Sequence, residues 1–504
     1  MANSNKSFGD STPVEAREDG SQLVPQHDPF DVRKLRRKMD LHLVPVVAVL
    51  YLFCFIDRSN LGNAKISGME KDLKMTGSEY NIILSSFYVG YILLEVPVVI
   101  ICKWMGPAWF LPLTSIGFGI CSVCTAFVST VPQACAVRFL LGVFEAGMMP
   151  GIAYYLSRFY ARAELTFRLS LYIVTAPLAG AFGGLLAGGI LKLPRIGWLT
   201  GWRMIFALEG ILTVGVAVVT LFLMANGPDT ARWLSAEEKK LAVERLRVER
   251  TASRESAQGE GAVDGGGARE KMARNARRFL RGVYSPVTLS VGFIFLLDAV
   301  TVQAFAFFLP TIVRTIYPKS TTVQQQLYTV PPYLVGALVM VSMSALSWRT
   351  DRRQIFFKPS TTMVLIGYIM FLSSTDPRVR YGATFLVASC FALGPLTNAQ
   401  VAANVVSDTT RSAAISINCM FAHIGGLVGS WSFVEWDAPH YRIGNSINLG
   451  TSVGILVLST ATLLWMKADN KARDRKQAET SESELTQEGV EDLDWRHPSW
   501  RWKP

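Results

Sequence analysis

The segment RFLLGVFEAGMMPG, residues 138–151, places two full charges inside a run of otherwise apolar residues. Arg138 and Glu145 are nearly two helical turns apart, so both side chains leave the same face of a helix, about 10 Å apart along its axis. A charged side chain at the centre of a bilayer costs about 2.5 to 3.5 kcal/mol. We therefore expect a membrane-spanning helix whose charged face lines a polar cavity, and a cavity through a membrane indicates transport.

The composition of the whole chain agrees with a membrane protein. Half of the 504 residues are hydrophobic and 18% are charged, whereas soluble domains usually have about 25% charged residues. The apolar residues form blocks of about 20, the length of helix that crosses a bilayer. The basic residues behind the net charge of +11 fall in alternate loops, so they predict membrane orientation and no nucleic-acid partner.

The apolar blocks predict an all-α membrane protein with twelve spans in two six-helix halves and with both termini in the cytosol. The expected domains are a disordered cytosolic tail (1–40), an N-terminal half (41–225), a cytosolic central loop (226–284), a C-terminal half (285–466) and a cytosolic tail (467–504). The spans are expected at about 41–57, 79–101, 109–128, 132–153, 169–190, 203–224, 286–312, 327–347, 356–374, 380–400, 412–433 and 447–466.

Local signals add detail to this plan. Ser235 and Glu238 predict a capping box at the start of a helix in the central loop, followed by a linker over 251–270. Gly180, Gly184 and Gly188 recur at four-residue intervals and predict a seam where a neighbouring helix approaches closely.

Two six-helix halves joined by a long loop resemble the major facilitator superfamily, whose halves rock around a central site. More specific strings resemble one branch, the anion:cation symporters, in the fungal allantoate and nicotinate permease subgroup. These strings are FIDRSNLGNA (55–64), YILLEVP (91–97), RFLLGVFEAGMMPG (138–151), GWRMIFALEG (201–210), WLSAEEKKLAVERLR (233–247), VPPYLVGAL (330–338) and DLDWRHPSWRW (492–502).

The resemblance implies that Asp57 and Glu145 carry protons, and that Arg58 and Arg138 bind substrate or hold the carboxyl groups in place. The residue types fit these roles, because a carboxyl group can titrate whereas a guanidinium stays charged and binds a carboxylate through two hydrogen bonds. We expect Arg58 to hold the substrate and Arg138 to position Glu145. Two structural alternatives stay open: an Asp57–Arg58 pair that closes a helix end, and a pair of Arg138 with Glu145 that joins spans 1 and 4.

Further candidates have weaker signals. Tyr88 and Tyr91 either present hydroxyl groups to the cavity or pack as aromatics. Gln303 and Asn404 are expected to contact substrate, and Asp298 is expected in the cavity. Gating or structural roles are expected for the remaining candidates, Glu95, Gly106, Asp351 and Arg352.

Three positions depart from the pattern of the resembling family: Trp104 in the turn after span 2, Gln400 in span 10 and His423 in span 11. The turn that holds Trp104 latches the cytosolic ends of the helices, so a different conformational balance is expected. Gln400 and His423 are expected to line the second half of the cavity, so an atypical substrate is expected. The resemblance therefore supports no particular substrate.

The sequence predicts secondary uptake of a small organic anion, such as a carboxylate vitamin or a ureide, by proton symport in the plasma membrane. The partners are then the anion, protons and the lipid bilayer, and the chain is expected to be a monomer and not an enzyme. The proton gradient drives it, so no cofactor and no metal are expected, and ATP-driven pumping lacks its glycine–lysine motif. Export of a secondary metabolite is the main alternative. A transporter-like sensor would need a long structured tail, which the sequence does not predict.

Overall fold

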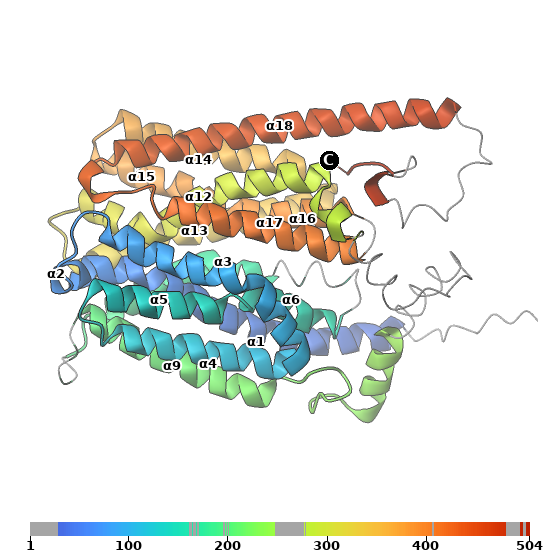
Figure 1. The fold of residues 1–504 in the computed structure, drawn as a ribbon, viewed down its shortest axis with the longest axis horizontal. Coiled ribbons are helices and arrows are strands. Elements are labelled where there is room, and N and C mark those ends of the chain that lie inside the picture. The colour runs from blue at the N-terminus through green and yellow to red at the C-terminus, as the bar shows by residue number, and fades with distance from the viewer. Residues whose placement is uncertain are drawn as a thin grey trace, which may run out of the picture.

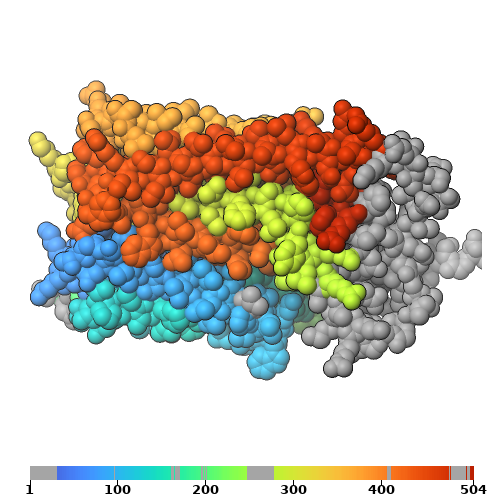
Figure 2. Space-filling model, turned by 45° about the horizontal axis from the view of Figure 1, so that its top comes forward, coloured from blue at the N-terminus to red at the C-terminus, as the bar shows by residue number. Residues whose placement is uncertain are grey.

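The computed structural model describes residues 29–160, 164, 168, 171–194, 197, 199, 201–246, 277, 279–405, 408–479, 494–496 and 500–503. These residues form an elongated bundle of helices (Figure 1). The central linker expected at 251–270 and the first 28 residues lie outside the described residues. Both halves run along the same long axis and adjoin as two bands on the face seen in Figure 2.

The N-terminal half consists of helices α1 to α9. Its elements are α1 (Pro29–Ala64), a π-helical turn η1 (Lys65–Met69), α2 (Glu70–Asp72), α3 (Glu79–Met105), α4 (Pro107–Thr125), α5 (Val131–Glu145), α6 (Met148–Ser157), α8 (Thr175–Ile190) and α9 (Trp202–Leu223).

The C-terminal half consists of helices α12 to α18. Its elements are α12 (Pro286–Ile316), α13 (Thr322–Thr350), η2 (Gln354–Phe356), α14 (Phe357–Ser373), α15 (Pro377–Val387), η3 (Ala388–Ala392), α16 (Leu393–Ala403), α17 (Asp408–Gly429), η4 (Glu435–Asp437) and α18 (Arg442–Glu479); a short turn, η7 (Asp494–Arg496), follows in the tail.

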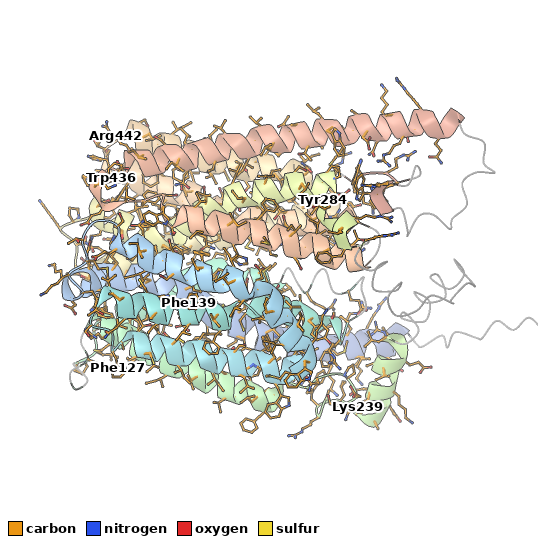
Figure 3. All side chains as sticks on the ribbon, in the orientation of Figure 1. Phe127, Phe139, Lys239, Tyr284, Trp436 and Arg442 are labelled. Carbon is orange, nitrogen blue, oxygen red and sulfur yellow. The ribbon has the colours of Figure 1, made fainter. Side chains whose placement is uncertain are left out.

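The bundle has two ends, which we name by what they carry. The loop end is where α1 ends and α18 begins, and it carries Trp436 and Arg442; the terminus end is where α1 begins and α18 ends, and it carries Lys239 (Figure 3).

Each of the twelve expected spans coincides with helix in the structure. Among the described residues, ten helical segments are long and apolar enough to cross a membrane, and α3, bent by 60° between Glu95 and Pro97, makes an eleventh. Helix α17 has a shorter apolar stretch, Ala413–Gly429. Two expected spans are composite: α5 and α6 form one of them, and α15, η3 and α16 form the other.

The expected glycine seam is confirmed, and its partner belongs to the other half. A Cβ atom at Gly180 would lie 2.4 Å from the ring of Tyr333 on α13, and one at Gly184 would lie 2.7 Å from the hydroxyl oxygen of Thr329 on α13. Larger side chains would push α8 and α13 apart. The seam therefore joins the two halves.

The terminus end differs from the expected tails. Helix α1 begins at Pro29, within the expected tail 1–40. Leu35, Met39 and Leu43 are buried at four-residue spacing, so this part of α1 has an apolar face that packs against the protein. Part of the expected central loop also lies at the terminus end. Its Ser235–Glu238 capping box is confirmed, with hydrogen bonds of 2.8 and 3.2 Å.

The C-terminal tail also packs against its half. Helix α18 continues to Glu479, and residues 500–503, which we call the tail strap, lie against the terminus end of the C-terminal half. Trp502 is 2% exposed and packs with Val287 of α12, Val401 of α16 and Met466 of α18. The expected polar tail 467–504 therefore contains a buried apolar anchor.

Candidate functional site

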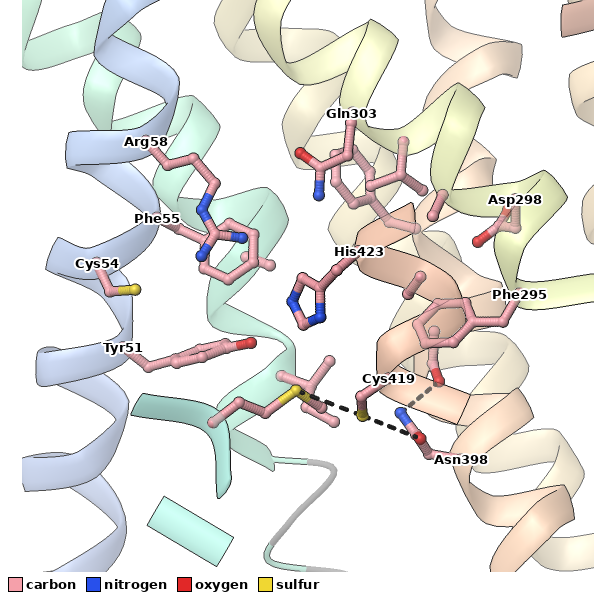
Figure 4. A pocket seen from close by; sticks show the side chains of 18 of the residues that line it. Tyr51, Cys54, Phe55, Arg58, Phe295, Asp298, Gln303, Asn398, Cys419 and His423 are labelled. Carbon is pink, nitrogen blue, oxygen red and sulfur yellow. Dashed lines mark hydrogen bonds between the residues drawn. The ribbon is translucent and has the colours of Figure 1, made fainter. Parts of the chain in front are cut away.

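A cavity lies between the two halves near the middle of the bundle (Figure 4). Its wall is largely apolar and includes Met148, Ile173, Phe295, Val302 and Met340. Its polar lining comes from both halves and consists of Tyr51, Arg58, Tyr91, Asp298, Gln303, Asn398 and His423.

Arg58 is paired with Glu145 at the edge of this cavity. The Nε and Nη2 atoms of Arg58 on α1 donate hydrogen bonds of 3.2 and 2.8 Å to one oxygen, Oε2, of Glu145 on α5. Glu145 is fully buried, whereas Arg58 lines the cavity and is 6% exposed. Glu145 therefore neutralises the guanidinium group that faces the cavity.

Aromatic rings hold the Arg58 guanidinium in place. The guanidinium carbon lies 4.7 Å from the ring centre of Phe55, 4.8 Å from that of Phe87 and 5.6 Å from that of Tyr91. Ring faces attract cations and cannot accept a proton from them. Arg58 can thus exchange one carboxylate partner for another without moving far.

Asp57 and Arg138 lie outside the cavity lining, in the core of the N-terminal half. The Asp57 carboxyl group accepts hydrogen bonds from Ser122 on α4, at 2.8 Å, and from Thr213 on α9, at 3.3 Å. The Nη1 atom of Arg138 donates to the backbone oxygen of Asp57 at 3.2 Å, and its guanidinium lies over the ring of Phe206. Arg138 thus holds the backbone beside Arg58.

This arrangement differs from the two pairings that the sequence left open. Neither an Asp57–Arg58 pair nor an Arg138–Glu145 pair is formed within the part of the chain that the structure describes; Arg58 pairs with Glu145 instead. The heptad spacing of Arg138 and Glu145 puts them on one face of α5, but the guanidinium that reaches the Glu145 carboxyl group comes from α1.

A third carboxyl group, that of Glu209, lies in the same core. The side-chain amide of Asn60 on α1 donates a hydrogen bond to Glu209 on α9. Both side chains are at most 1% exposed. Three carboxyl groups, Asp57, Glu145 and Glu209, therefore lie buried with two guanidinium groups in one half.

Tyr91 and His423 meet across the boundary between the halves. Their ring centres are 4.1 Å apart, and Nδ1 of His423 lies 3.5 Å from a carboxyl oxygen of Glu95. Glu95 stands at the bend of α3, so this contact links the bend to α17. Tyr88 instead packs against the backbone of Gly426 and does not line the cavity.

Gln303 lines the cavity, whereas Asn404 does not. The side-chain amides of Gln400 and Asn404 donate hydrogen bonds of 2.8 and 3.0 Å to the backbone oxygen of Lys503, and Asn404 accepts one of 2.8 Å from the Lys503 nitrogen. Both side chains are at most 1% exposed. Gln400 of α16 and Asn404, which follows the end of that helix, therefore bind the tail strap and lie away from the cavity lining.

The other expected gating residues occupy turns at the terminus end. Gly106 separates α3 from α4 with a φ of 85°, where a Cβ atom would lie 2.8 Å from the Asn226 side chain. Asp351 ends α13 in a left-handed conformation and pairs with Arg353, and Arg352 is exposed. Trp104 is 86% exposed.

Two of the polar lining residues, Tyr51 and Asn398, were not predicted from the sequence. Tyr51 lies seven residues before Arg58 on α1, hence on the same helix face, and its hydroxyl group points into the cavity (Figure 4). Asn398 of α16 accepts a hydrogen bond of 2.9 Å from Asn418. The spacing from Arg58 could have identified Tyr51, and Asn398 is a polar residue inside an expected span.

Hydrogen bonds join the halves at the loop end, beyond the cavity. Asn81 of α3 donates to the backbone oxygens of Ser430 and Phe433 at 2.6 and 3.0 Å, and Tyr80 donates to the backbone oxygen of Phe307 at 3.2 Å. Gln326 of α13 donates to the backbone oxygen of Asn63 at 3.1 Å. We call these four hydrogen bonds the loop-end contacts.

Comparison with known proteins identifies the same architecture. Residues 47–430 match the sequence profile of the Major Facilitator Superfamily. The chain is 31% identical to the MFS-type transporter efuF of Hormonema carpetanum over 93% of this chain and 92% of that protein. It is 30% identical to the high-affinity nicotinic acid transporter of Saccharomyces cerevisiae over 90% of this chain and 80% of that one.

Solved structures show the same fold at low sequence identity. The partially occluded, inward-open xylose transporter XylE of E. coli superposes with a TM-score of 0.61 at 14% identity, covering 82% of this chain and 96% of that one. The expected two-half, all-helical fold is thereby confirmed.

Proposed function

Because this chain belongs to the major facilitator superfamily, we propose that it moves a small organic anion across a membrane together with protons, by alternating access. The observation that carries the proposal is the pairing of Arg58, which lines the cavity, with the buried Glu145. Arg58 is the one arginine or lysine among the described residues that line this cavity. An anion that enters the cavity therefore competes with Glu145 for the same guanidinium group.

Protonation of Glu145 resolves this competition. A neutral Glu145 no longer attracts Arg58 as an ion, so the guanidinium can bind a substrate carboxylate through two hydrogen bonds. Since a proton on Glu145 favours the anion, the bound anion favours the proton to the same extent. Proton and anion enter together, and the site stays neutral in both the empty and the loaded state.

We assign Asp57 as the second proton carrier. Its oxygens accept hydrogen bonds from two hydroxyl groups, and the same hydroxyl oxygens can accept a hydrogen bond from a protonated carboxyl group. Its neighbour Arg58 lies on the same turn of α1, and Arg138 binds the backbone between them. A change of charge at Asp57 therefore acts on the helix turn that presents Arg58.

Alternating access requires the loop-end contacts to break. We propose that the terminus end faces the cytosol. The basic residues between Arg33 and Lys38 favour this orientation. The cavity is then closed toward the outside by the contacts of Asn81, Tyr80 and Gln326. Opening to the outside exchanges these contacts for new ones at the terminus end.

We further propose that the chain belongs to the anion:cation symporters of the allantoate and nicotinate permease kind and acts as a monomer in the plasma membrane. The similarity to a nicotinic acid transporter along 90% of this chain supports this assignment. A carboxylate vitamin, a ureide or a similar acid is the substrate class that follows.

Export of a metabolite was the alternative, motivated by the atypical residues Trp104, Gln400 and His423. Trp104 is exposed and Gln400 binds the tail strap, so only His423 of the three lines the cavity. Because His423 alone of these three residues is placed to contact the substrate, we favour uptake over export. If the protein exported its substrate, the substrate would accumulate in the direction opposite to the one that an acidic exterior drives.

The proposal is tested in proteoliposomes that contain the purified full chain. We expect radiolabelled nicotinate or another small carboxylate of the vitamin and ureide classes to accumulate when the outside is acidic, and a protonophore to abolish the accumulation. Uptake that ignores both the pH gradient and the protonophore would sink the proposal. Empty liposomes control for passive entry of the neutral acid.

A further inference from the structure

The tail strap, residues 500–503, is held by contacts of the kind that bind a peptide ligand. The side chain of Asn470 on α18 forms two hydrogen bonds with the backbone of Trp502. It accepts one of 2.8 Å from the Trp502 nitrogen and donates one of 2.9 Å to the Trp502 oxygen. A side-chain amide has both a donor and an acceptor, so one asparagine can bind both backbone groups of a peptide residue.

The next strap residue is bound in the same way by a second asparagine. Asn404 accepts a hydrogen bond of 2.8 Å from the Lys503 nitrogen and donates one of 3.0 Å to the Lys503 oxygen, to which Gln400 also donates at 2.8 Å. Asn404 lies at the end of α16, whereas Asn470 belongs to α18. The backbone of the strap is therefore bound by two helices at once.

Side chains of the strap are bound as specifically as its backbone. The Trp502 ring is buried against Val287, Val401 and Met466, and its ring nitrogen donates a hydrogen bond of 2.7 Å to Asp469. A tryptophan ring thus fills an apolar pocket while its one polar atom has a partner. These three apolar residues belong to α12, α16 and α18, so the ring also joins three helices at the terminus end.

The arginine before Trp502 has partners of its own. Arg501 donates from Nε to Asp474 at 2.7 Å and from Nη2 to Gln477 at 2.6 Å. In peptide recognition, hydrogen bonds to the main chain supply affinity and contacts to individual side chains supply specificity. We call the residues that make these contacts the strap site: Val287, Gln400, Val401, Asn404, Met466, Asp469, Asn470, Asp474 and Gln477.

We infer that the strap site is a peptide-binding site for an arginine–tryptophan sequence, and that the tail strap occupies it as an exchangeable ligand supplied by the chain itself. This inference goes beyond anion transport and does not depend on the substrate. A bound strap holds the ends of α12, α16 and α18 together. A released strap leaves Gln400 and Asn404 without the backbone of Lys503, so its release loosens this end of the C-terminal half.

The test uses the purified full chain and a synthetic, fluorescently labelled peptide with the sequence of residues 492–504. The full-length variant Trp502→Ala weakens the hold of the chain's own strap and so makes the strap site accessible. We expect saturable binding of the peptide to this variant, measured by fluorescence anisotropy. Binding to the parent chain should be at least about 10-fold weaker, because its tethered strap competes at a high effective concentration.

Two further measurements identify the site of binding. A labelled peptide that itself carries Trp502→Ala should bind the variant chain at least about 10-fold more weakly, since a buried tryptophan commonly dominates such an interface. Adding Asn404→Ala to the variant chain should also weaken binding of the unchanged peptide. Gln324→Ala, which truncates an exposed amide at the loop end, is the matched control and should leave binding unchanged.

The peptide should also stabilise the chain that it binds. Because a ligand that binds only the folded state raises the midpoint of thermal unfolding, the unchanged peptide should raise the midpoint of Trp502→Ala toward that of the parent. If Trp502→Ala does not fold, Lys503→Pro replaces it in the same titrations. That change removes the N–H group that Asn404 binds and retains the buried ring.

Three results would overturn the inference. A folded variant chain that does not bind the unchanged peptide would show that the strap is a fixed part of the bundle. Equal binding of the peptide to the parent and to the variant would place the peptide elsewhere on the protein. Equal binding of the two peptides would show that the tryptophan is not recognised.

Discussion

The two halves of this transporter share one helical plan but hold very different charges. The N-terminal half buries three carboxyl groups, Asp57, Glu145 and Glu209, with the guanidinium groups of Arg58 and Arg138. Among the described residues that line the cavity, the C-terminal half contributes one carboxyl group, Asp298, beside the neutral side chains of Gln303 and Asn398 and the imidazole of His423. The groups that we propose to carry protons and to bind the anion thus lie in the N-terminal half.

The two halves also differ in how the segment after the last helix packs at the terminus end. In each half the segment that follows the last helix folds back on its own helices. In the N-terminal half the contact has a partly exposed part, in which Lys38 binds Glu238 at 2.6 Å and His42 stacks on Trp233, beside the buried Leu234. In the C-terminal half the contact is the buried tail strap around Trp502. Loss of the Trp502 ring should therefore cost more stability than loss of the partly exposed Lys38–Glu238 pair.

The largest expected effect comes from Arg58→Gln. This change removes the cation proposed to bind the substrate and leaves Glu145 buried without its partner, which costs about 3 to 5 kcal/mol in a buried ion pair. Proton-driven uptake should fall below detection in proteoliposomes. The double variant Arg58→Gln with Glu145→Gln should recover thermal stability and stay inactive. Normal uptake by either variant would show that the anion does not bind at the charged groups of the N-terminal half.

The second largest effect is expected at Glu145, where a substitution should separate anion binding from proton coupling. In the parent chain, carboxylate affinity should fall by up to about 10-fold per pH unit above the pH at which Glu145 titrates, because one proton binds with the anion. Glu145→Gln keeps an acceptor for Arg58 but cannot titrate. Its affinity should vary by less than about 2-fold per pH unit, and it should still exchange labelled for unlabelled substrate. An unchanged pH slope in Glu145→Gln would assign the coupling proton elsewhere.

The fold could be predicted from the sequence because its signal is repeated along the chain. Each apolar block of about 20 residues predicted a span independently, and each coincides with helix. The glycines of α8 and the Ser235–Glu238 capping box were also predicted, because both depend on residues a few positions apart.

The site could be predicted only in part, because pairing between helices is not a local property. Arg138 and Glu145 are on one helix face, yet the partner of Glu145 is Arg58, 87 positions earlier. Asn404 is polar within an expected span, and its partner, Lys503, lies 99 positions away in a tail with no hydrophobic period. Neither partner could be identified without the packing of α1 and of the tail strap.

The tail strap should affect stability more than chemistry. Trp502→Ala removes a buried ring from the cluster of Val287, Val401 and Met466, and truncations of this kind cost about 3 kcal/mol or more. We expect a lower midpoint of thermal unfolding in detergent, with substrate affinity unchanged at low temperature. Trp104→Ala, which truncates an exposed ring, is the control and should leave the midpoint in place. Equal effects of the two changes would contradict the buried role of the strap.

The smallest effect is expected at the polar contact of the N-terminal half. Lys38 and the Ser235 backbone bind the Glu238 carboxylate and lower its pKa below the usual value. The contact therefore contributes stability above the usual glutamate pKa near 4.5, and this stability is lost as the pH falls through the lowered pKa. Glu238→Gln should cost only about 0.5 kcal/mol at neutral pH. If Glu238→Gln lowers stability as much as Trp502→Ala does, the expected difference between these contacts of the two halves is wrong.

The central claim is that Arg58 and Glu145 bind one anion and one proton as a unit. Its most direct test is the movement of protons caused by substrate in proteoliposomes without an imposed pH gradient, followed with a pH-sensitive dye inside. When a fully ionised carboxylate is added outside proteoliposomes that contain the parent chain, their lumen should become more acidic. In proteoliposomes with Glu145→Gln, most of that acidification should be lost while exchange of substrate continues. Substrate entry without acidification in the parent chain, or full acidification in Glu145→Gln, would contradict the account.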